Sequence, residues 1–112
     1  VKLRFKDSVR VTLLDTNLFA GLLALAHMLV AEFELSEVWI TSVNDGVHKP
    51  GSLHYEGRAV DIRCKAFDRA RLSSVVQGFK AQYDLLYDLI WEAPGTPNEH
   101  LHLEYDPENR NR

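Results

Sequence analysis

The chain has 112 residues, 46% of them hydrophobic, with a net charge of -3 and a pI near 5.9. This length predicts one domain, residues 1–112, that buries roughly 60–70% of its unfolded surface. The single cysteine, Cys64, excludes an internal disulfide framework, and the acidic balance without a basic patch argues against a nucleic-acid binder.

The N-terminal third predicts one extended segment and one helix. Residues 1–14 suggest an extended or strand segment. Residues 16–33 place apolar side chains at i, i+3, i+4 and i+7, which is the pattern of a buried helix. Asp15 or Asn17 can cap its start.

The 16–33 segment is also close in length to a membrane span. Asn17, His27 and Glu32 interrupt it, and no basic region precedes a small-residue cleavage site of the signal-peptide kind. We therefore expect a core helix of a soluble protein, with no signal peptide and no membrane insertion.

The middle of the chain predicts two strands joined by a loop. Residues 37–43 are β-branched and aromatic, which indicates a strand, and the Gly- and Pro-containing residues 44–51 end it. Residues 59–64 alternate as a second strand, with even-numbered residues facing the core and Asp61 on the opposite face.

The C-terminal part predicts a second helix over residues 66–82 and two further strands, 85–92 and 100–105, separated by a turn-prone segment. The tail, 106–112, lacks an apolar anchor and should be frayed. The predicted fold is α+β, with two helices on one face of a mainly antiparallel sheet and the other face carrying a site.

Two stretches of the chain carry candidate metal ligands. The run SLHYEGRAVDI contains His54 and Asp61, and the chain returns later with Glu99-His100-Leu101-His102. A catalytic zinc takes three nitrogen or oxygen side chains and leaves a fourth position for water, whose pKa falls towards about 7. His54, Asp61 and His102 would supply that set, and His100 shares a strand face with His102.

The SLHYEGRAVDI run resembles, letter for letter, the zinc-site segment of the hedgehog signalling domain. The looser pattern Ser-x-His-x-x-Gly-x-Ala-x-Asp followed by His-x-His is similar to that of the D-alanyl-D-alanine metallopeptidases, which belong to the same structural superfamily. The resemblance covers roughly residues 37–105. It implies that His54, Asp61 and His102 bind zinc, and that His100 lies beside the metal and assists the reaction.

Peptide hydrolysis also needs a proton acceptor close to the metal but not bonded to it. The hedgehog-like layout places such a group at Glu92, which closes its predicted strand. Glu99 instead has the Glu-x-x-His spacing of the dipeptidase branch. Residues three apart on a strand face opposite sides, which ranks Glu92 above Glu99. His100 is either a further acid, base or transition-state stabiliser, or a hydrogen-bond partner of a ligand.

Three residues are candidates for substrate contact. His48 precedes His54 by six residues, as in the hedgehog domain, and either overhangs the site or is an ordinary loop histidine. The bacterial peptidases usually carry an Arg near the substrate carbonyl, but residues 40–51 contain none. Lys49, Arg58 or the zinc alone would then polarise the carbonyl, and Arg58 has the alternative of a surface ion pair. The absence of this Arg from residues 40–51 favours endopeptidase over carboxypeptidase action.

The resemblance implies a compact zinc metallopeptidase of phage or bacterial type. Its substrate would be a peptidoglycan peptide with D-amino acids, cleaved by a zinc-activated water. The alternative is a hedgehog-like zinc-containing module that binds a partner without turnover. The chain has no N-terminal Cys for lipidation and no long acidic loop of the calcium-binding kind, which disfavours signalling.

Overall fold

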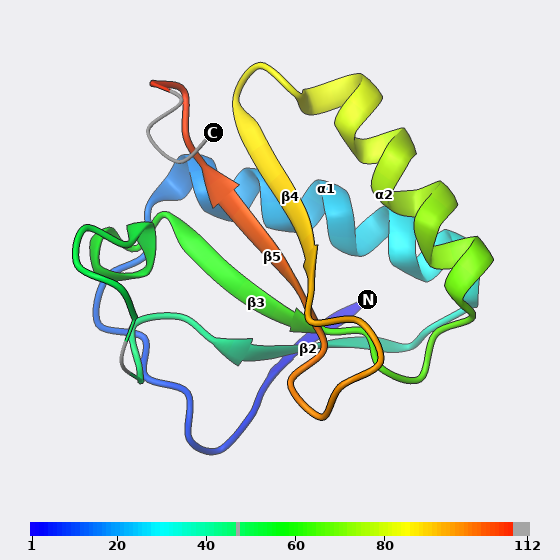
Figure 1. The fold of residues 1–112 in the computed structure, drawn as a ribbon, viewed down its shortest axis with the longest axis horizontal. Helices are drawn as coiled ribbons and strands as arrows, with labels where there is room; N and C mark the ends of the chain where they lie inside the picture. The colour runs from blue at the N-terminus through cyan, green and yellow to red at the C-terminus, as the bar shows by residue number, and fades with distance from the viewer. Residues whose placement is uncertain (47, 109–112) are drawn as a thin grey trace.

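The computed structural model describes residues 1–46 and 48–108. The chain folds into a five-stranded sheet with two α-helices, and Figure 1 shows how they are arranged. The elements in chain order are β1 (Lys2–Phe5), α1 (Thr16–Phe33), β2 (Glu37–Ser42), the short 3-10 helix η1 (Leu53–Glu56), β3 (Ala59–Arg63), α2 (Arg69–Tyr83), β4 (Tyr87–Glu92) and β5 (His100–Tyr105).

The predicted helix 16–33 and strand 100–105 match α1 and β5, while other predicted ends shift by a few residues. The second helix begins at Arg69, because Asp68 caps it by accepting from the Arg71 backbone N–H at 3.0 Å. The residues before the cap form a turn closed by the Phe67 N–H on the Cys64 carbonyl. A polar side chain that accepts such a bond ends the extended segment and starts the helix.

The strand order is β1-β2-β3-β5-β4. The β1–β2 pair is parallel, whereas β2–β3, β3–β5 and β4–β5 are antiparallel. The expectation of a mainly antiparallel sheet is therefore corrected to a mixed sheet. The β1–β2 pair is parallel because α1 connects the two strands and returns the chain to the end of the sheet at which β1 began.

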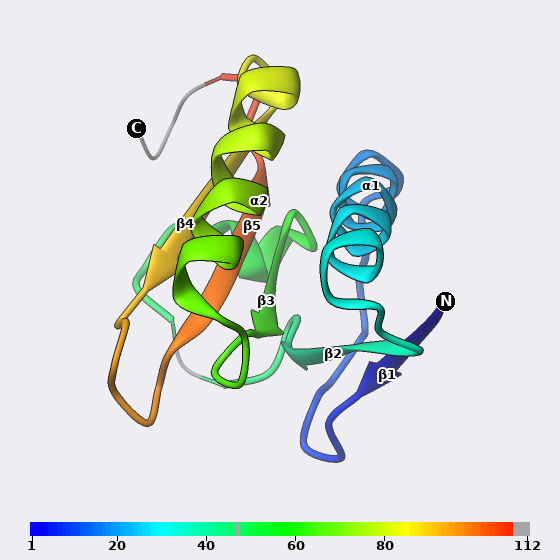
Figure 2. The same ribbon diagram turned by 90° about the vertical axis from the view of Figure 1, so that its right-hand side faces the viewer.

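Both helices cover the same face of the sheet, as Figure 2 shows, and the hydrophobic core lies between them and the strands. The alternation along β3 and β5 follows from this layering. The side chains that enter the core are Val60, Ile62, Leu101 and Leu103, all 0–1% exposed. Asp61, His100 and His102 consequently face away from the helices.

Among the described residues, α1 is the one helix with the length and composition to cross a membrane. Its buried residues pack in the core of this compact globule, which is the position of a core helix. Asp15 caps it by accepting from the backbone N–H groups of Asn17 and Leu18. Of the two predicted caps, Asp15 is therefore the one used.

The chain remains anchored after β5, contrary to the predicted fraying from residue 106. Asp106 is fully buried, and its backbone N–H donates to the Leu86 carbonyl at 2.9 Å. This bond continues the β4–β5 pairing by one step, which sequence hydropathy does not reveal. The rest of the prediction falls partly on residues 109–112, which lie outside the described part of the chain.

Candidate metal centre

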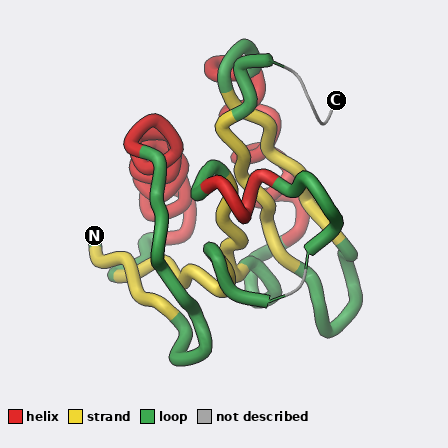
Figure 3. The backbone as a smooth tube through the Cα atoms, turned by 90° about the vertical axis from the view of Figure 1, so that its left-hand side faces the viewer, coloured by secondary structure: helices red, strands yellow, loops and turns green. Residues whose placement is uncertain are grey.

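The centre of the sheet brings together residues that lie far apart in the sequence. Antiparallel pairing of β3 with β5 sets Asp61 opposite His102, and pairing of β4 with β5 sets Glu92 opposite His100. His54 comes from η1, the short helix in front of the strands in Figure 3. Ser52 caps η1 by accepting from the His54 backbone N–H, which fixes the start of that turn.

Three imidazoles converge on one carboxylate oxygen. Asp61 Oδ1 lies 2.9 Å from His102 Nδ1, 3.3 Å from His54 Nε2 and 3.7 Å from His100 Nε2. Glu92 Oε1 lies 3.4 Å from His100 Nε2 and 3.5 Å from His102 Nδ1. The predicted ligands and the predicted base therefore share one cluster.

The outward nitrogen of each imidazole faces an oxygen that can only accept a hydrogen bond. The pairs are His54 Nδ1 with Val43 O at 2.8 Å, His100 Nδ1 with Asn98 O at 2.6 Å, and His102 Nε2 with Glu104 Oε1 at 2.7 Å. In each neutral ring the outward nitrogen must carry the proton. The inward nitrogen of a neutral ring then directs a lone pair at the Asp61 carboxylate, an arrangement that a cation bound between them would stabilise. A ring that is protonated on both nitrogens donates to Asp61 instead.

The pKa values of Asp61 and His102 are both shifted in the direction that favours a charged pair. Burial alone would raise the pKa of Asp61, but hydrogen bonds with His102 and His54 hold it well below its ordinary value. Burial would lower the pKa of His102, yet hydrogen bonds with Asp61 and Glu104 raise it to about 9. Both shifts favour an ion pair between a protonated His102 and the Asp61 carboxylate.

The donor set could bind a metal ion. Asp61, Glu92, His100 and His102 each offer one donor atom, and these atoms all lie within 4.8 Å of one another. Donors bonded to one tetrahedral zinc at about 2.0–2.2 Å lie about 3.3–3.6 Å apart. His54 is not one of these four residues, but its Nε2 lies 3.3 Å from Asp61 Oδ1, which matches that edge length. The His102–Asp61 distance of 2.9 Å is shorter and is that of a direct hydrogen bond.

Glu99 is not brought to this cluster. It lies on the helix side of β5, where its carboxylate accepts from Trp91 Nε1 at 2.7 Å, Arg69 Nη1 at 3.1 Å and Gly95 N at 3.2 Å. These bonds hold the β4–β5 loop against the start of α2. The Glu-x-x-His spacing places the glutamate on the face opposite His102, as strand alternation requires.

His48 and Lys49 lie at the pocket above the cluster, and Arg58 lies elsewhere. The His48 ring stacks on His54 with centroids 3.9 Å apart. Arg58 is close to Asp15 and Glu108, and its guanidinium lies over the Tyr105 ring. The pocket has a volume of about 360 Å³ and is lined by His48, Lys49, Ser52, His54, Asp61, Ile90, Glu92, His100, His102 and Glu104.

Sequence reasoning missed Glu104, which is 5% exposed and contacts the far side of the His102 ring. A signal existed: the alternation His100, His102, Glu104 continues along one face of the same strand. Carboxylates commonly orient metal-bound histidines in this way. The oxygens behind His54 and His100 are backbone carbonyls, which no residue type could have indicated.

These features define an α+β domain with a candidate metal centre on the open face of its sheet. The family model of the Hedgehog amino-terminal signalling domain matches residues 20–88, which is more than half of the chain. The chain belongs to the Hedgehog amino-terminal signalling domain family. The match includes His54 and Asp61 and ends before Glu92, His100 and His102. No solved structure gives a significant match.

Proposed function

We propose that this protein is a zinc-dependent peptidase. The observation that carries the proposal is the convergence of three inward-facing imidazole nitrogens on the Asp61 carboxylate, with a second carboxylate, Glu92, at the edge of the cluster. A set of nitrogen and oxygen donors around one point suits zinc. A glutamate beside such a centre suits a proton acceptor.

His54, Asp61 and His102 are the proposed ligands, in preference to a set with His100. The His54 side chain is 3% exposed and that of His100 is 24% exposed. A buried imidazole whose outward nitrogen is hydrogen-bonded is held in one orientation, as a ligand must be. His100 remains accessible to a substrate that enters the pocket.

Zinc bound there would lower the pKa of a coordinated water towards about 7 and polarise the scissile carbonyl. Glu92, whose side chain is 43% exposed, accepts a proton from the attacking water and passes it to the leaving amine. When its ring is protonated on both nitrogens, His100 Nε2, 3.4 Å from Glu92 Oε1, can donate to this carboxylate or to the developing oxyanion.

Two clefts meet at the cluster, which supports endopeptidase action. The pocket over Glu92 and Glu104 shares His48, Asp61 and His100 with a second cleft on the side of Lys6 and Arg63. A peptide can therefore extend in both directions from a bond held over the metal. Peptidoglycan peptides are the proposed substrates, by analogy with the metallopeptidases that the zinc motif resembles.

A second candidate is a zinc-containing binding module without turnover. Membership of the Hedgehog amino-terminal signalling domain family favours it. Such a module would hold the same zinc and bind wall peptides or a protein partner, but would release no amine from them. The two candidates therefore differ in turnover and agree in metal content.

The deciding experiment measures amine release from peptidoglycan and defined wall peptides by zinc-loaded protein. We expect cleavage that stops with a chelator and returns with zinc. Glu92→Gln should lose on the order of a hundredfold in rate while keeping its zinc. Glu34→Gln, on an exposed residue after α1, is the matched control. Zinc-loaded protein that binds these peptides but never cleaves them would contradict the peptidase and support the binding module.

A further inference from the structure

The second cleft beside the metal centre is lined by cationic side chains. It has a volume of about 680 Å³ and reaches the centre along Asp61 and His100. Lys6 follows β1, Arg63 ends β3, and Lys65 follows two residues later. All three are exposed, so their charges are available to a ligand in the cleft.

These charges are not neutralised within the described part of the chain. No carboxylate of residues 1–46 or 48–108 forms an ion pair with Lys6, Arg63 or Lys65. Asp61 and Glu99 also line the cleft, but both carboxylates contact other groups, and that of Glu99 lies on the helix side of the sheet. The first is bonded to the cluster histidines and the second to Arg69 and Trp91. In a protein of net charge -3, the cleft is thus locally positive.

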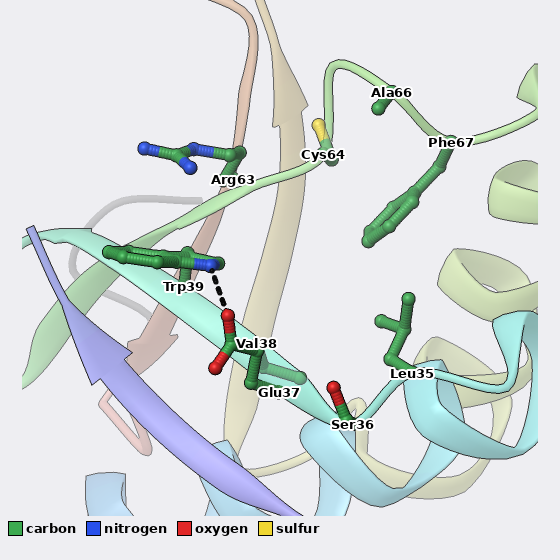
Figure 4. Close-up of a pocket in the computed structure, with 9 residues that line it drawn as sticks. All are labelled: Leu35, Ser36, Glu37, Val38, Trp39, Arg63, Cys64, Ala66 and Phe67. Carbon is green, nitrogen blue, oxygen red and sulfur yellow. Dashed lines mark hydrogen bonds between the residues drawn. The ribbon is translucent and has the colours of Figure 1, made fainter.

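Arg63 is held in place by an aromatic ring. Its guanidinium lies over Trp39, 4.8 Å from the ring centroid, and Figure 4 shows the two groups stacked. The indole N–H donates to Glu37 Oε1 at 3.1 Å, which fixes the orientation of the ring. A guanidinium ordered in this way presents a planar set of donors that fits a carboxylate.

The sheet register gives the distance from the metal centre. Arg63 is two residues after Asp61 on the same face of β3 and pairs with His100 of β5. Two residues of a strand span about 6.5–7 Å, which is also the length of about two residues of an extended peptide. A group bound by Arg63 would therefore lie within about two residues of the bond held over the metal.

We propose that the cleft formed by Lys6, Arg63 and Lys65 is a subsite for a carboxylate of the substrate peptide, about two residues from the scissile bond. Its place relative to that bond rests on the proposed peptidase function, whereas carboxylate binding itself does not. The carboxylate can belong to an acidic side chain or to a free C-terminus, and the two sources are separated experimentally.

The test compares peptides that differ only in charge. Short N-acetylated peptides carrying an acidic side chain with an amidated C-terminus, or a neutral side chain with a free C-terminus, are titrated calorimetrically into zinc-loaded protein. The fully amidated neutral peptide is the reference. We expect at least one carboxylate peptide to bind roughly tenfold more tightly than the reference, with a preference that weakens at high salt.

Variants distinguish the cleft from the metal itself, because a carboxylate could also bind zinc directly. Arg63→Gln and the double variant Lys6→Gln, Lys65→Gln should remove most of the preference without loss of zinc. Lys80→Gln, on the exposed face of α2, should keep it. Equal affinity for charged and neutral peptides, or a preference that survives in Arg63→Gln and in the double variant, would overturn the proposal.

Peptidase activity is measured separately, as amine release from the same peptides. Carboxylate-dependent binding without cleavage supports the subsite and contradicts the peptidase. Cleavage that is indifferent to the carboxylate, with equal affinities, supports the peptidase and overturns the subsite.

Discussion

At the scale of single residues, the candidate metal centre contains groups that orient the histidines from the side away from Asp61. Glu104 contacts His102 Nε2 at 2.7 Å, and the Val43 carbonyl contacts His54 Nδ1 at 2.8 Å. Each contact turns the other ring nitrogen towards Asp61. The affinity of the centre should therefore depend on the groups behind the rings as well as on the ligands.

Removing the carboxylate behind His102 tests this dependence. Glu104→Gln can turn an NH₂ group to the ring and no longer specifies which nitrogen carries the proton. We expect zinc affinity to fall about 10- to 100-fold, with far-ultraviolet circular dichroism unchanged. Competition with a chromogenic chelator measures the affinity. Glu108→Gln, on an exposed residue, is the control, and an unchanged affinity in Glu104→Gln would contradict the proposed orientation.

The choice between His54 and His100 as a ligand leads to opposite outcomes in two alanine variants. His54→Ala should lose most bound zinc, because a ligand is removed. His100→Ala should keep about one zinc per chain and lose activity on wall peptides, because only a reaction partner is removed. Elemental analysis of protein purified without chelators supplies the measurement. Full occupancy in His54→Ala combined with metal loss in His100→Ala would reverse the assignment.

At the scale of elements, the turn from η1 into β3 sets the position of His54 relative to Asp61. Gly57 ends η1 with φ of 70°, a left-handed conformation that favours glycine. Its carbonyl accepts from the Asp15 N–H, and a Cβ at this position would lie 2.5 Å from the Leu13 carbonyl oxygen. The close approach of the N-terminal segment therefore requires glycine here.

Gly51 and Gly57 have similar φ angles, so their alanine variants distinguish backbone strain from a steric clash of the added Cβ. Gly51 has φ of 79°, but a Cβ there would meet nothing within 4 Å. Gly51→Ala should cost about 1–2 kcal/mol of unfolding free energy from the left-handed conformation alone. Gly57→Ala should cost clearly more and should also weaken zinc binding, since η1 must shift. Urea denaturation measures both variants, and equal losses would refute the close contact.

At the scale of the whole molecule, the metal would connect η1 to the two central strands. A ligand that binds only the folded state stabilises it by about 2.7 kcal/mol at a concentration of 100 times its Kd. The proposed ligands lie on η1, β3 and β5, so no local segment could hold the metal in the unfolded chain with the same geometry.

Zinc should therefore raise the midpoint of thermal unfolding by several degrees, and a chelator should reverse the effect. Asp61→Ala should remove the response, because it deletes the oxygen on which the imidazoles converge. Arg63→Gln should keep it, since this residue lies outside the ligand set. Differential scanning calorimetry measures the shift. An unchanged midpoint for the zinc-loaded wild-type protein would contradict a metal that is bound by the folded state alone.

The local pattern of apolar and polar residues alone determined two of the elements and the sheet face on which several site residues lie. The helix over residues 16–33 and the strand over 100–105 follow from the spacing of apolar residues, because side-chain period depends only on neighbours in the chain. The same alternation placed Asp61 and His102 on the face away from the core. It also ranked Glu92 above Glu99, whose carboxylate bonds Arg69 on the helix side.

Only the tertiary structure decided which of these pieces meet. The period of side chains along a strand or helix does not specify three of the observed contacts. These are the parallel pairing of β1 with β2, the contact of Glu104 with His102, and the ion pairs of Arg58. The cationic cleft is the clearest case, since Lys6 is far from Arg63 in the sequence and reaches the same cleft through the order of the strands. Periodicity fixes the face of a residue, whereas strand order and side-chain packing select its neighbours.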